Sequence, residues 1–342
     1  MTTGKPDATL KRPILIGIGG DSGTGKSTLT AGFYRIVGGS RITTLCLDDY
    51  HSLDRRERKL LGVTALDPRA NDFFRMESQL LDLKRGQPIM KPVYDHHDGT
   101  FGPPEEVVPR DFVIVQGLHP FLVPGVRALF DLKVWLDPEE SLKHRWKIQR
   151  DVAKRGYSAE AVAQEIEVRR PDVEAYIAPQ RAFADLVVRF YRAPEDGDDE
   201  HLNVQITTRS TLPFLNLDGL LEEPHAGVRA SSAEDAGKAS HLLEIDGGLD
   251  RATVRDFEER IWGHMDARHQ HLRHLAPEQF GDFADGALRT HHSDPLALTQ
   301  LLLVHRILSA KKSMLLRVDL GAHDASDHDH ELHSGAHDHE HP

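Results

Sequence analysis

Residues 20–28 have the composition and spacing of a loop that binds phosphate groups. Gly20, Gly25, Lys26 and Ser27 satisfy the pattern G-x-x-x-x-G-K-[ST]. In such a loop, backbone N–H groups turn inward around an anion, the lysine reaches the β- and γ-phosphates, and the serine hydroxyl can bind Mg²⁺. Ser22 stands where a dinucleotide-binding loop needs its third glycine, so that alternative is not favoured. The predicted nucleotide-binding residues are Gly20, Asp21, Ser22, Gly23, Thr24, Gly25, Lys26, Ser27 and Thr28.

Two further segments with reactive side chains follow predicted strands. Asp48–His51 comes after one apolar run and Gln116–His119 after another. Because the carboxyl ends of parallel strands meet at one edge of a sheet, both segments should lie near the phosphate loop. A carboxylate there could accept a proton from a hydroxyl that attacks the transferred phosphoryl group. The alternative for Asp48 and Asp49 is a solvated turn or a helix cap.

Charged residues recur at helical spacing in two places. Lys147, Arg150, Asp151 and Arg155 include pairs at spacings of three and four, and Arg55 and Lys59 are four positions apart. Residues at spacings of three and four share one face of a helix, where cations could pair with a phosphorylated ligand. Taken alone, the spacing equally fits a solvated face with an ion pair.

The predicted elements alternate between strands and helices, which indicates an α/β fold with a mostly parallel sheet covered by helices on both faces. The expected strands are 14–18, 43–47, 112–115, 132–136, 184–190, 202–208, 212–217 and 241–245, and the expected helices are 26–37, 72–84, 138–155, 159–168, 252–274 and 295–310. Residues 91–99 should form an extended segment with a turn, and residues 222–238 should be flexible. The predicted division is a lead-in without structure (1–12), a domain that carries the phosphate loop (13–192), an α+β extension (193–320) and a disordered tail (321–342).

Composition restricts the class of protein. The chain has 342 residues, a net charge of −12 and one cysteine, Cys46. The negative charge argues against nucleic-acid binding, and the absence of a long apolar run predicts no membrane span. The first ten residues lack the apolar centre of a signal peptide, and a single cysteine suits a reducing cytosol, so we expect a cytoplasmic protein.

Beyond these patterns, the chain resembles the phosphoribulokinase family, most closely its plant and cyanobacterial type. The resemblance is dense over residues 13–190 and fainter from LEIDG (243–247) onward. The segments that carry it are GDSGTGKST (20–28), CLDDYHSLDR (46–55), TALDPRAN (64–71), KPVY (91–94), QGLHP (116–120), WKIQRD (146–151) and AYIAPQR (175–181). It implies a P-loop kinase that uses MgATP to phosphorylate ribulose 5-phosphate on its 1-hydroxyl, and it suggests a homodimer.

The resemblance also implies roles for individual residues. Asp48 matches the catalytic base, Lys26 and Ser27 match positions at the ATP phosphates and Mg²⁺, and Asp151 matches an acidic residue tied to the metal. The positions expected around the sugar phosphate are His51, Arg55, Lys59, Tyr94, His96, Lys147, Arg150 and Arg155. These cations suit a phosphorylated sugar better than an uncharged nucleoside.

Two positions depart from the family pattern. Gln116 stands where the family has glutamate, so it could bind Mg²⁺ through its carbonyl oxygen but without a negative charge. The missing charge implies that activity is weak or absent, unless another carboxylate such as Asp49 supplies that charge. Thr24 stands where plant-type enzymes carry a redox cysteine, so Cys46 has no partner in this chain and we expect no regulatory disulfide.

Three alternatives remain at the level of sequence. The first is a catalytically weak regulatory or binding protein on the same fold, suggested by Gln116. The second is a uridine-type kinase. The third is a metal-insertion GTPase, suggested by the seven histidines between His323 and Pro342, although the chain has no Asn-Lys-x-Asp motif. Imidazoles and carboxylates in that tail could bind Zn²⁺ or Ni²⁺; otherwise it is a solvating acidic tail.

Overall fold

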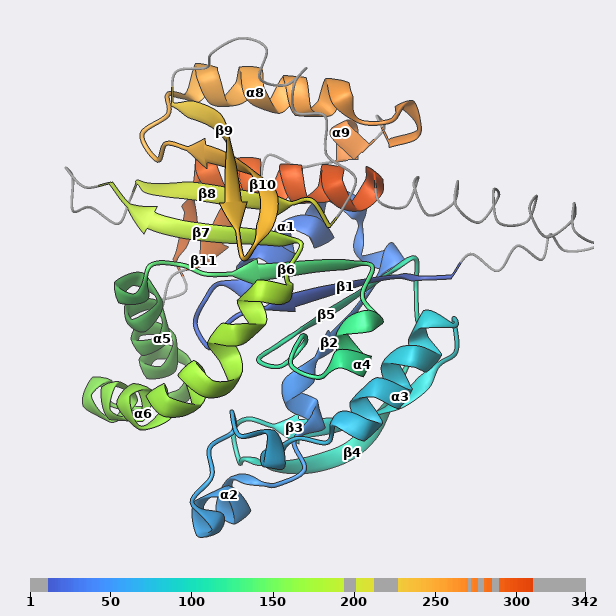
Figure 1. Cartoon of the computed structure of the whole chain (residues 1–342), viewed down its shortest axis with the longest axis vertical. Coiled ribbons are helices and arrows are strands. Elements are labelled where there is room, and N and C mark those ends of the chain that lie inside the picture. The colour runs from blue at the N-terminus through green and yellow to red at the C-terminus, as the bar shows by residue number, and fades with distance from the viewer. Residues whose placement is uncertain are drawn as a thin grey trace, which may run out of the picture.

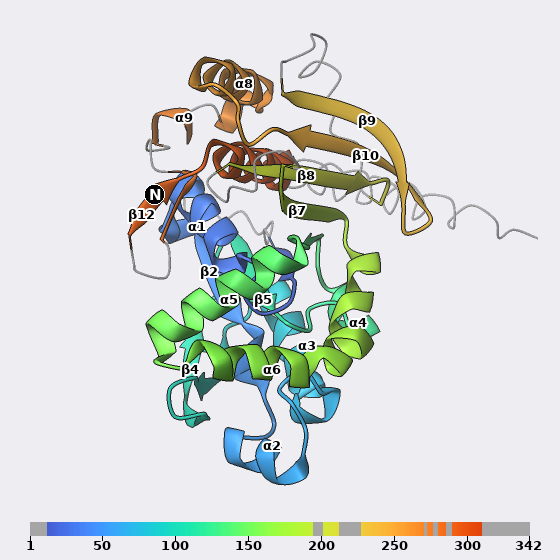
Figure 2. The same cartoon turned by 90° about the vertical axis from the view of Figure 1, so that its left-hand side faces the viewer.

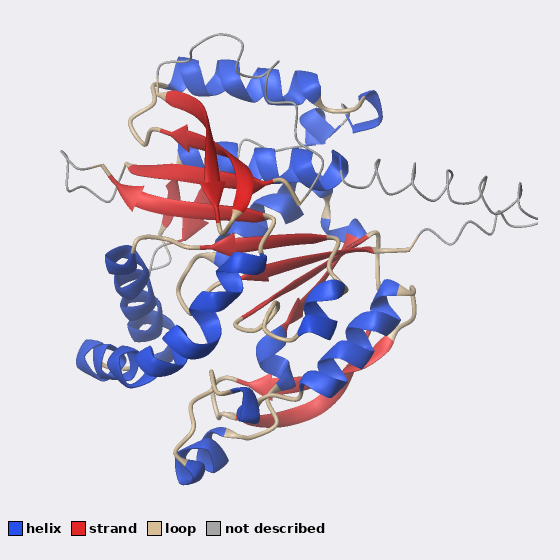
Figure 3. Ribbon diagram, viewed as in Figure 1, coloured by secondary structure: helices blue, strands red, loops and turns tan. Residues whose placement is uncertain are grey.

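A computed structural model describes residues 12–193, 201–211, 227–269, 272–275, 280–284 and 289–309. Its centre is an eight-stranded sheet with the strand order β2-β5-β1-β6-β7-β8-β10-β9 (Figures 1 and 3). Five strands are mutually parallel: β1 (Ile14–Gly19), β2 (Ile42–Cys46), β5 (Phe112–Gly117), β6 (Leu132–Leu136) and β7 (Leu186–Arg192). The predicted α/β class with a mostly parallel sheet is confirmed.

The register of the parallel strands brings three loops together. Gly19 at the end of β1 pairs with Gly117 of β5, and Gln116 of β5 pairs with Cys46 at the end of β2. The phosphate loop, the segment after Cys46 and the segment after Gln116 therefore leave the sheet at one edge, as the sequence predicted.

Three antiparallel strands continue the same sheet beyond β7. They are β8 (Leu202–Arg209), β10 (Lys238–Ile245) and β9 (Val228–Asp235), which forms the outer edge. The expectation of a flexible segment over 222–238 is wrong for residues 228–235. This strand consists mainly of exposed polar residues, and its hydrogen-bonded pairing with β10 holds it in an extended conformation. The predicted strand over 212–217 lies outside the described residues.

Helices cover both faces of the sheet, and alternating side chains of β1 divide the core between them. Ile14 and Ile16 belong to a cluster with α1 (Lys26–Val37), α8 (Arg251–His264) and the helix of residues 294–309. Leu15 belongs to a second cluster with α3 (Phe73–Lys84) and α4 (Pro124–Ala128). This alternation is the period-two pattern of a strand that is buried on both sides.

The chain between β2 and β5 forms a separate layer below the sheet. It contains α2 (Arg55–Leu61), α3 and a hairpin of β3 (Ile89–Asp95) with β4 (Thr100–Val107). The predicted extended segment with a turn over 91–99 is confirmed, whereas its partner strand β4 was not predicted. The segment Leu47–Tyr50 is a 3₁₀ turn, so β2 ends at Cys46, one residue before the predicted bound of 47.

Two helices cross the side of the molecule at the mouth of the phosphate loop (Figure 2). The first, α5 (Glu140–Arg155), ends at Gly156, whose φ of 70° is in the left-handed region, as the sequence predicted. The second, α6 (Ala159–Asp172), runs past Val168 and continues as one π-helical turn, Val173–Ile177.

The C-terminal region packs against the helix of the phosphate loop. The amide nitrogen of Gln300 donates to the carbonyl oxygen of Thr28 at 3.0 Å, and its oxygen accepts from the N–H of Gly281 at 2.7 Å. Instead of one helix over 252–274, α8 ends at His264 and a short helix α9 (Leu272–Leu275) follows. The small strands β11 (Asp282–Ala284) and β12 (Thr290–His292) pair with each other.

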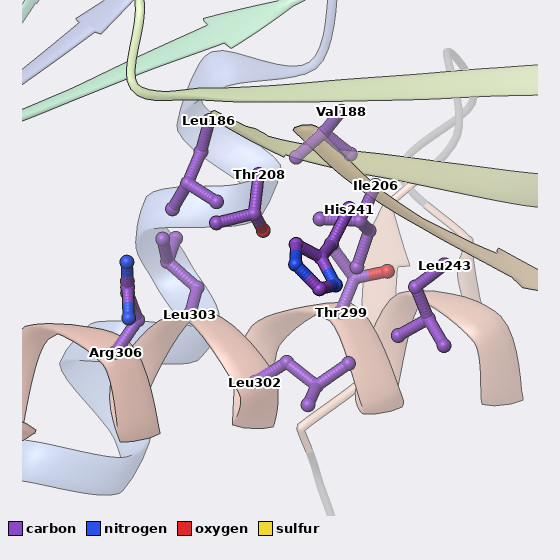
Figure 4. Close-up of a pocket in the computed structure, with 10 residues that line it drawn as sticks. All are labelled: Leu186, Val188, Ile206, Thr208, His241, Leu243, Thr299, Leu302, Leu303 and Arg306. Atoms are coloured by element: carbon purple, nitrogen blue, oxygen red, sulfur yellow. The ribbon is translucent and has the colours of Figure 1, made fainter. Parts of the chain in front are cut away.

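A cavity of about 30 Å³ lies between the sheet and the helix of residues 294–309 (Figure 4). Aliphatic side chains line most of it, with Arg306 at one end. Its size is close to that of a single water molecule. It is therefore too small for a sugar phosphate or a nucleotide.

Candidate active site

The phosphate loop connects β1 to α1 and depends on three glycines with positive φ. Gly20, Gly23 and Gly25 have φ values of 147°, 85° and 88°. No heavy atom outside its chain neighbours lies within 4 Å of a Cβ built on Gly25, so its outward side is open. The ammonium group of Lys26 donates to the carbonyl oxygens of Gly20 and Asp21 at 2.8 and 2.7 Å. The side chain thus lies across the loop, and Ser27 beside it is exposed.

Burial makes Lys26 a titrating group near neutral pH. It lowers the pKa of Lys26 to about 8, although the nearby charges of Asp48 and Asp21 oppose the shift. Bound phosphates favour the protonated amine, so nucleotide binding above pH 8 must take up a proton.

We expect the affinity for MgATP to be constant below pH 8 and to fall by about tenfold per pH unit above it. Calorimetric titrations between pH 6.5 and 9.5 measure this. The matched control is Lys26→Arg, whose guanidinium keeps its proton throughout, so its affinity should not show the decline. An affinity of the unmodified protein that stays constant up to pH 9.5 would contradict the role given to Lys26.

Asp48 lies in the 3₁₀ turn after β2 and faces the phosphate loop. One of its oxygens is 3.8 Å from Nε2 of His96. Burial acts to raise the pKa of Asp48, but the charges of His51, His96 and Lys26 outweigh it, so the pKa is below its ordinary value. The carboxylate is therefore ionised at neutral pH. An ionised carboxylate near the phosphate-loop lysine could accept a proton from an acceptor hydroxyl.

The neighbouring Asp49 has a structural role. Its two oxygens accept from the ammonium group of Lys91 at 2.5 Å and from the N–H of Tyr94 at 2.9 Å. These contacts fasten the hairpin β3–β4 to the turn that carries Asp48. With both oxygens engaged, Asp49 is poorly placed to supply the charge that Gln116 lacks.

Three aromatic rings adjoin Asp48. The ring of Tyr94 packs edge-to-face against His51 at 4.8 Å and against His96 at 5.2 Å. Nδ1 of the buried His51 lies 2.9 Å from the side-chain oxygen of Asn71, and burial lowers the pKa of His51. The Tyr94 hydroxyl accepts from Arg58 at 2.7 Å. The structure therefore brings His51, Tyr94 and His96 together beside Asp48.

Arg55 and Lys59 have different surroundings. The guanidinium of Arg55 donates to the carbonyl oxygens of His96 and His97 at 2.6 and 3.1 Å, so it holds the turn of the hairpin. Lys59 is exposed on α2. Their assignment to the sugar phosphate stays a prediction.

The cations of α5 surround one buried carboxylate. Asp151 has a side-chain exposure of 0% and lies 2.9 Å from Lys147, 2.9 Å from Arg150 and 3.3 Å from Arg155. These cations lower its pKa against the opposing effect of burial. Lys147 also approaches Glu165 of α6 at 3.4 Å. The observed partners of Asp151 are cations, so its assignment as a metal ligand stays a prediction.

This helix rests directly on the phosphate loop. Arg150 donates to the hydroxyl oxygen of Ser22 at 2.9 Å. A Cβ on Gly23 would lie 2.8 Å from Cβ of Lys147, so only glycine allows this approach. Lys143 contributes a further ion pair, 3.2 Å from Asp21. The cations of α5 therefore lie directly against the phosphate loop.

The side chain of Gln116 indicates where Mg²⁺ could bind. Its side-chain oxygen is buried and has no hydrogen-bond partner within the described part of the chain. An uncompensated buried acceptor is unfavourable unless a ligand fills its place. A hard cation that binds oxygen ligands suits this oxygen together with the exposed hydroxyl of Ser27. The residues present therefore fit a magnesium ion bound with a nucleotide.

Three residues that the sequence did not single out belong to these surroundings. They are Arg58, whose guanidinium lies 5.3 Å from the Tyr94 ring centre, Lys143, and Arg169, which helps to lower the pKa of Asp48. Arg169 lies on α6 and pairs with Glu165 at 2.7 Å. Its spacing of four from Glu165 was visible in the sequence, but its proximity to Asp48 depends on how α6 folds back.

The chain is similar in sequence to known proteins over most of its length. Residues 15–195 match the model of the Phosphoribulokinase / Uridine kinase family. A phosphoribulokinase of Synechocystis sp. is 38% identical over 304 residues, which cover 83% of this chain and 88% of the relative. A uridine kinase of Lactiplantibacillus plantarum is 32% identical over 206 residues, which cover 58% of this chain and 95% of the relative.

A solved structure is similar in fold. The phosphoribulokinase from Rhodobacter spheroides aligns with a TM-score of 0.53 at 20% sequence identity and covers 78% of this chain and 98% of its own. No helix among the described residues is long and apolar enough to cross a membrane. With a family model over half of its length and a relative at 38% identity over most of it, this chain belongs to the Phosphoribulokinase / Uridine kinase family.

Proposed function

We propose that the chain transfers the γ-phosphoryl group of ATP to the 1-hydroxyl of ribulose 5-phosphate, giving ribulose 1,5-bisphosphate. The observation that carries this proposal is the cation cluster of α5, which lies against the phosphate loop through the contact of Arg150 with Ser22. A substrate that already bears a phosphate needs such charges, whereas an uncharged nucleoside does not. The similarity to the cyanobacterial phosphoribulokinase also extends beyond the part shared with the uridine kinase.

The chain's own residues divide the work of phosphoryl transfer. Lys26 and the loop amides bind the β- and γ-phosphates and hold them in place. Asp48 accepts the proton of the attacking hydroxyl as the new O–P bond forms. In a loose transition state the attacking hydroxyl keeps its proton until late in the reaction. A carboxylate with a low pKa is therefore sufficient as the base. Lys147, Arg150 and Arg155 orient the substrate phosphate and offset the negative charge on the transferred group.

Ser27 and Gln116 would hold the magnesium ion that accompanies ATP. When bound, this ion neutralises charge on the phosphate oxygens. Gln116 differs from the family's glutamate only in charge, so the missing charge should appear in the dependence on Mg²⁺.

We expect Gln116→Glu to lower the free Mg²⁺ concentration that gives half-maximal activity by at least about tenfold, because a carboxylate attracts a dication more strongly than an amide does. Mg²⁺ titrations at a fixed concentration of MgATP measure this. The matched control is Gln116→Met, which keeps the size but removes the oxygen ligand, so it should raise the required concentration. An unchanged Mg²⁺ dependence in both variants would show that residue 116 does not contact the metal.

The acceptor distinguishes the proposed function from its alternatives. ADP release should be stimulated by ribulose 5-phosphate and not by uridine. Stimulation by uridine alone would identify a nucleoside kinase and overturn the proposal. No stimulation by either acceptor, together with normal ATP binding, would identify a binding protein on a kinase fold, and the Gln116→Glu variant then tests whether the missing carboxylate is the cause.

Other expectations from the sequence stay predictions. They are the homodimer, the cytoplasmic location, the absence of nucleic-acid partners, and Zn²⁺ or Ni²⁺ on the tail. The tail, residues 321–342, lies outside the described residues.

A further inference from the structure

Three different ligand atoms converge at the edge of the sheet beside the phosphate loop. Sγ of Cys46, a carboxylate oxygen of Asp48 and a ring nitrogen of His96 all lie within 4.8 Å of one another. Cys46 and Asp48 are half-buried, and His96 is exposed. The first two come from the end of β2 and the turn after it, and the third comes from the turn of the hairpin β3–β4.

Contacts outside the triad fix its spacing. Asp49 binds the N–H of Tyr94 and the ammonium group of Lys91, which ties the start and end of β3 to the turn that carries Asp48. Arg55 donates to the carbonyl oxygen of His96 at 2.6 Å, and the Tyr94 ring packs against the His96 ring. The three ligands therefore come from parts of the chain that are already held together. In a metal centre, each of these ligand atoms would lie about 2.0–2.3 Å from the ion.

The kinds of ligand favour one class of cation. A thiolate, an imidazole and a carboxylate together are typical of Zn²⁺, with one position left open for water. Mg²⁺ prefers oxygen ligands only, so the metal of the phosphoryl transfer has little affinity for this triad.

We propose that Cys46, Asp48 and His96 form a binding site for a divalent cation of the Zn²⁺ class, and that occupation of this site blocks phosphoryl transfer. A cation bound to Asp48 takes up the lone pairs that would accept the substrate proton. The inhibition rests on the proposed function of Asp48, whereas the binding of the metal does not.

Binding replaces the proton of the thiol. Burial raises the pKa of Cys46 to about 12, so the free protein carries the neutral S–H form. The S–H bond breaks, the sulfur lone pair binds the ion, and the proton passes to the buffer, so one proton is released for each ion bound.

Cobalt(II) tests the binding without any measurement of activity. Because Cys46 is the only cysteine in the chain, a near-ultraviolet thiolate-to-Co²⁺ charge-transfer band can arise only from this site, even if histidines elsewhere also bind cobalt. We expect one equivalent of such a band in the full-length protein, its loss in Cys46→Ser, and its displacement by Zn²⁺. The absence of this band in the unmodified protein would overturn the proposal.

Inhibition is measured separately, at millimolar Mg²⁺, with each variant compared with its own rate in the absence of zinc. Removal of a ligand should raise the Zn²⁺ concentration for half inhibition in Cys46→Ser by at least about 10- to 100-fold, the range for loss of an outer-shell partner alone. Equal inhibition of the unmodified protein and Cys46→Ser would show that zinc acts elsewhere, for example on ATP. A cobalt band without inhibition would keep the metal site but refute its effect on Asp48. If the protein shows no kinase activity at all, the cobalt experiment still decides whether the site binds metal.

Discussion

Replacement of Asp48 by asparagine is expected to lower kcat by roughly 10²–10⁴-fold, the range that a positioned general base contributes. The change keeps the size of the side chain and removes its ability to take the proton of the acceptor hydroxyl. Binding of MgATP should be largely retained, because the phosphate contacts come from the loop and Lys26. Loss of the Asp48 charge lowers the pKa of Lys26 further, so this binding is measured on the acid side of neutrality, at pH 6.5. Rates in the steady state and calorimetric titration with nucleotide measure the two effects.

The adjacent carboxylate is the matched control. Asp49 binds Lys91 and the N–H of Tyr94, so Asp49→Asn should lower the midpoint of thermal unfolding but retain most of the turnover of the folded enzyme. If Asp48→Asn and Asp49→Asn lose activity and stability in parallel, Asp48 is a structural residue and another group takes the proton.

Replacement of Asp151 by asparagine is expected to lower the free energy of unfolding by about 3 kcal/mol, the lower end of the range for breaking a buried ion pair. The carboxylate has 0% exposure, and its loss leaves Lys147, Arg150 and Arg155 without their common partner. The lower end applies because Arg150 and Arg155 are 32% and 38% exposed, so water compensates part of the loss. The KM for the sugar phosphate should rise as the cations separate.

Glu165 provides the control because it binds the same lysine from α6 with 40% of its side chain exposed. Glu165→Gln should lower the free energy of unfolding by less than about 1 kcal/mol.

The pKa of Asp151 is lowered in the folded protein, so its stabilising contribution is present above the ordinary aspartate pKa of 3.8 and is lost as the pH falls below it. In acid, the free energy of unfolding of the Asp151→Asn variant, measured with denaturant, should therefore approach that of the unmodified protein. If Asp151→Asn lowers the free energy of unfolding at neutral pH by no more than Glu165→Gln does, the central role of the Asp151 carboxylate is refuted.

Local signals in the sequence were sufficient for much of this fold. Glycine spacing identified the phosphate loop, and the rule for parallel strand ends placed Asp48 beside it. The expected helix 138–155 agrees with α5 to within two residues, and Gly156 follows its last residue. These features depend on residues close together in the chain.

The remaining features depend on contacts between distant segments. The strand Val228–Asp235 has polar, exposed side chains and exists because it pairs with β10. The meeting of Cys46 and Asp48 with His96 requires the hairpin to fold back onto the turn, which no local pattern reveals. Likewise, only the assembled structure shows that the cations of α5 share Asp151 and that the Gln116 oxygen is left without a partner.

The most direct test of the proposed function is the identity of the product. Phosphorus NMR of a reaction with MgATP and ribulose 5-phosphate should show ADP and a sugar bisphosphate in equal amounts, with two phosphomonoester signals. The same reaction with Asp48→Asn should show neither within the same time. Release of inorganic phosphate without a bisphosphate, or formation of a nucleoside monophosphate from uridine with no bisphosphate from ribulose 5-phosphate, would contradict transfer onto a phosphorylated sugar.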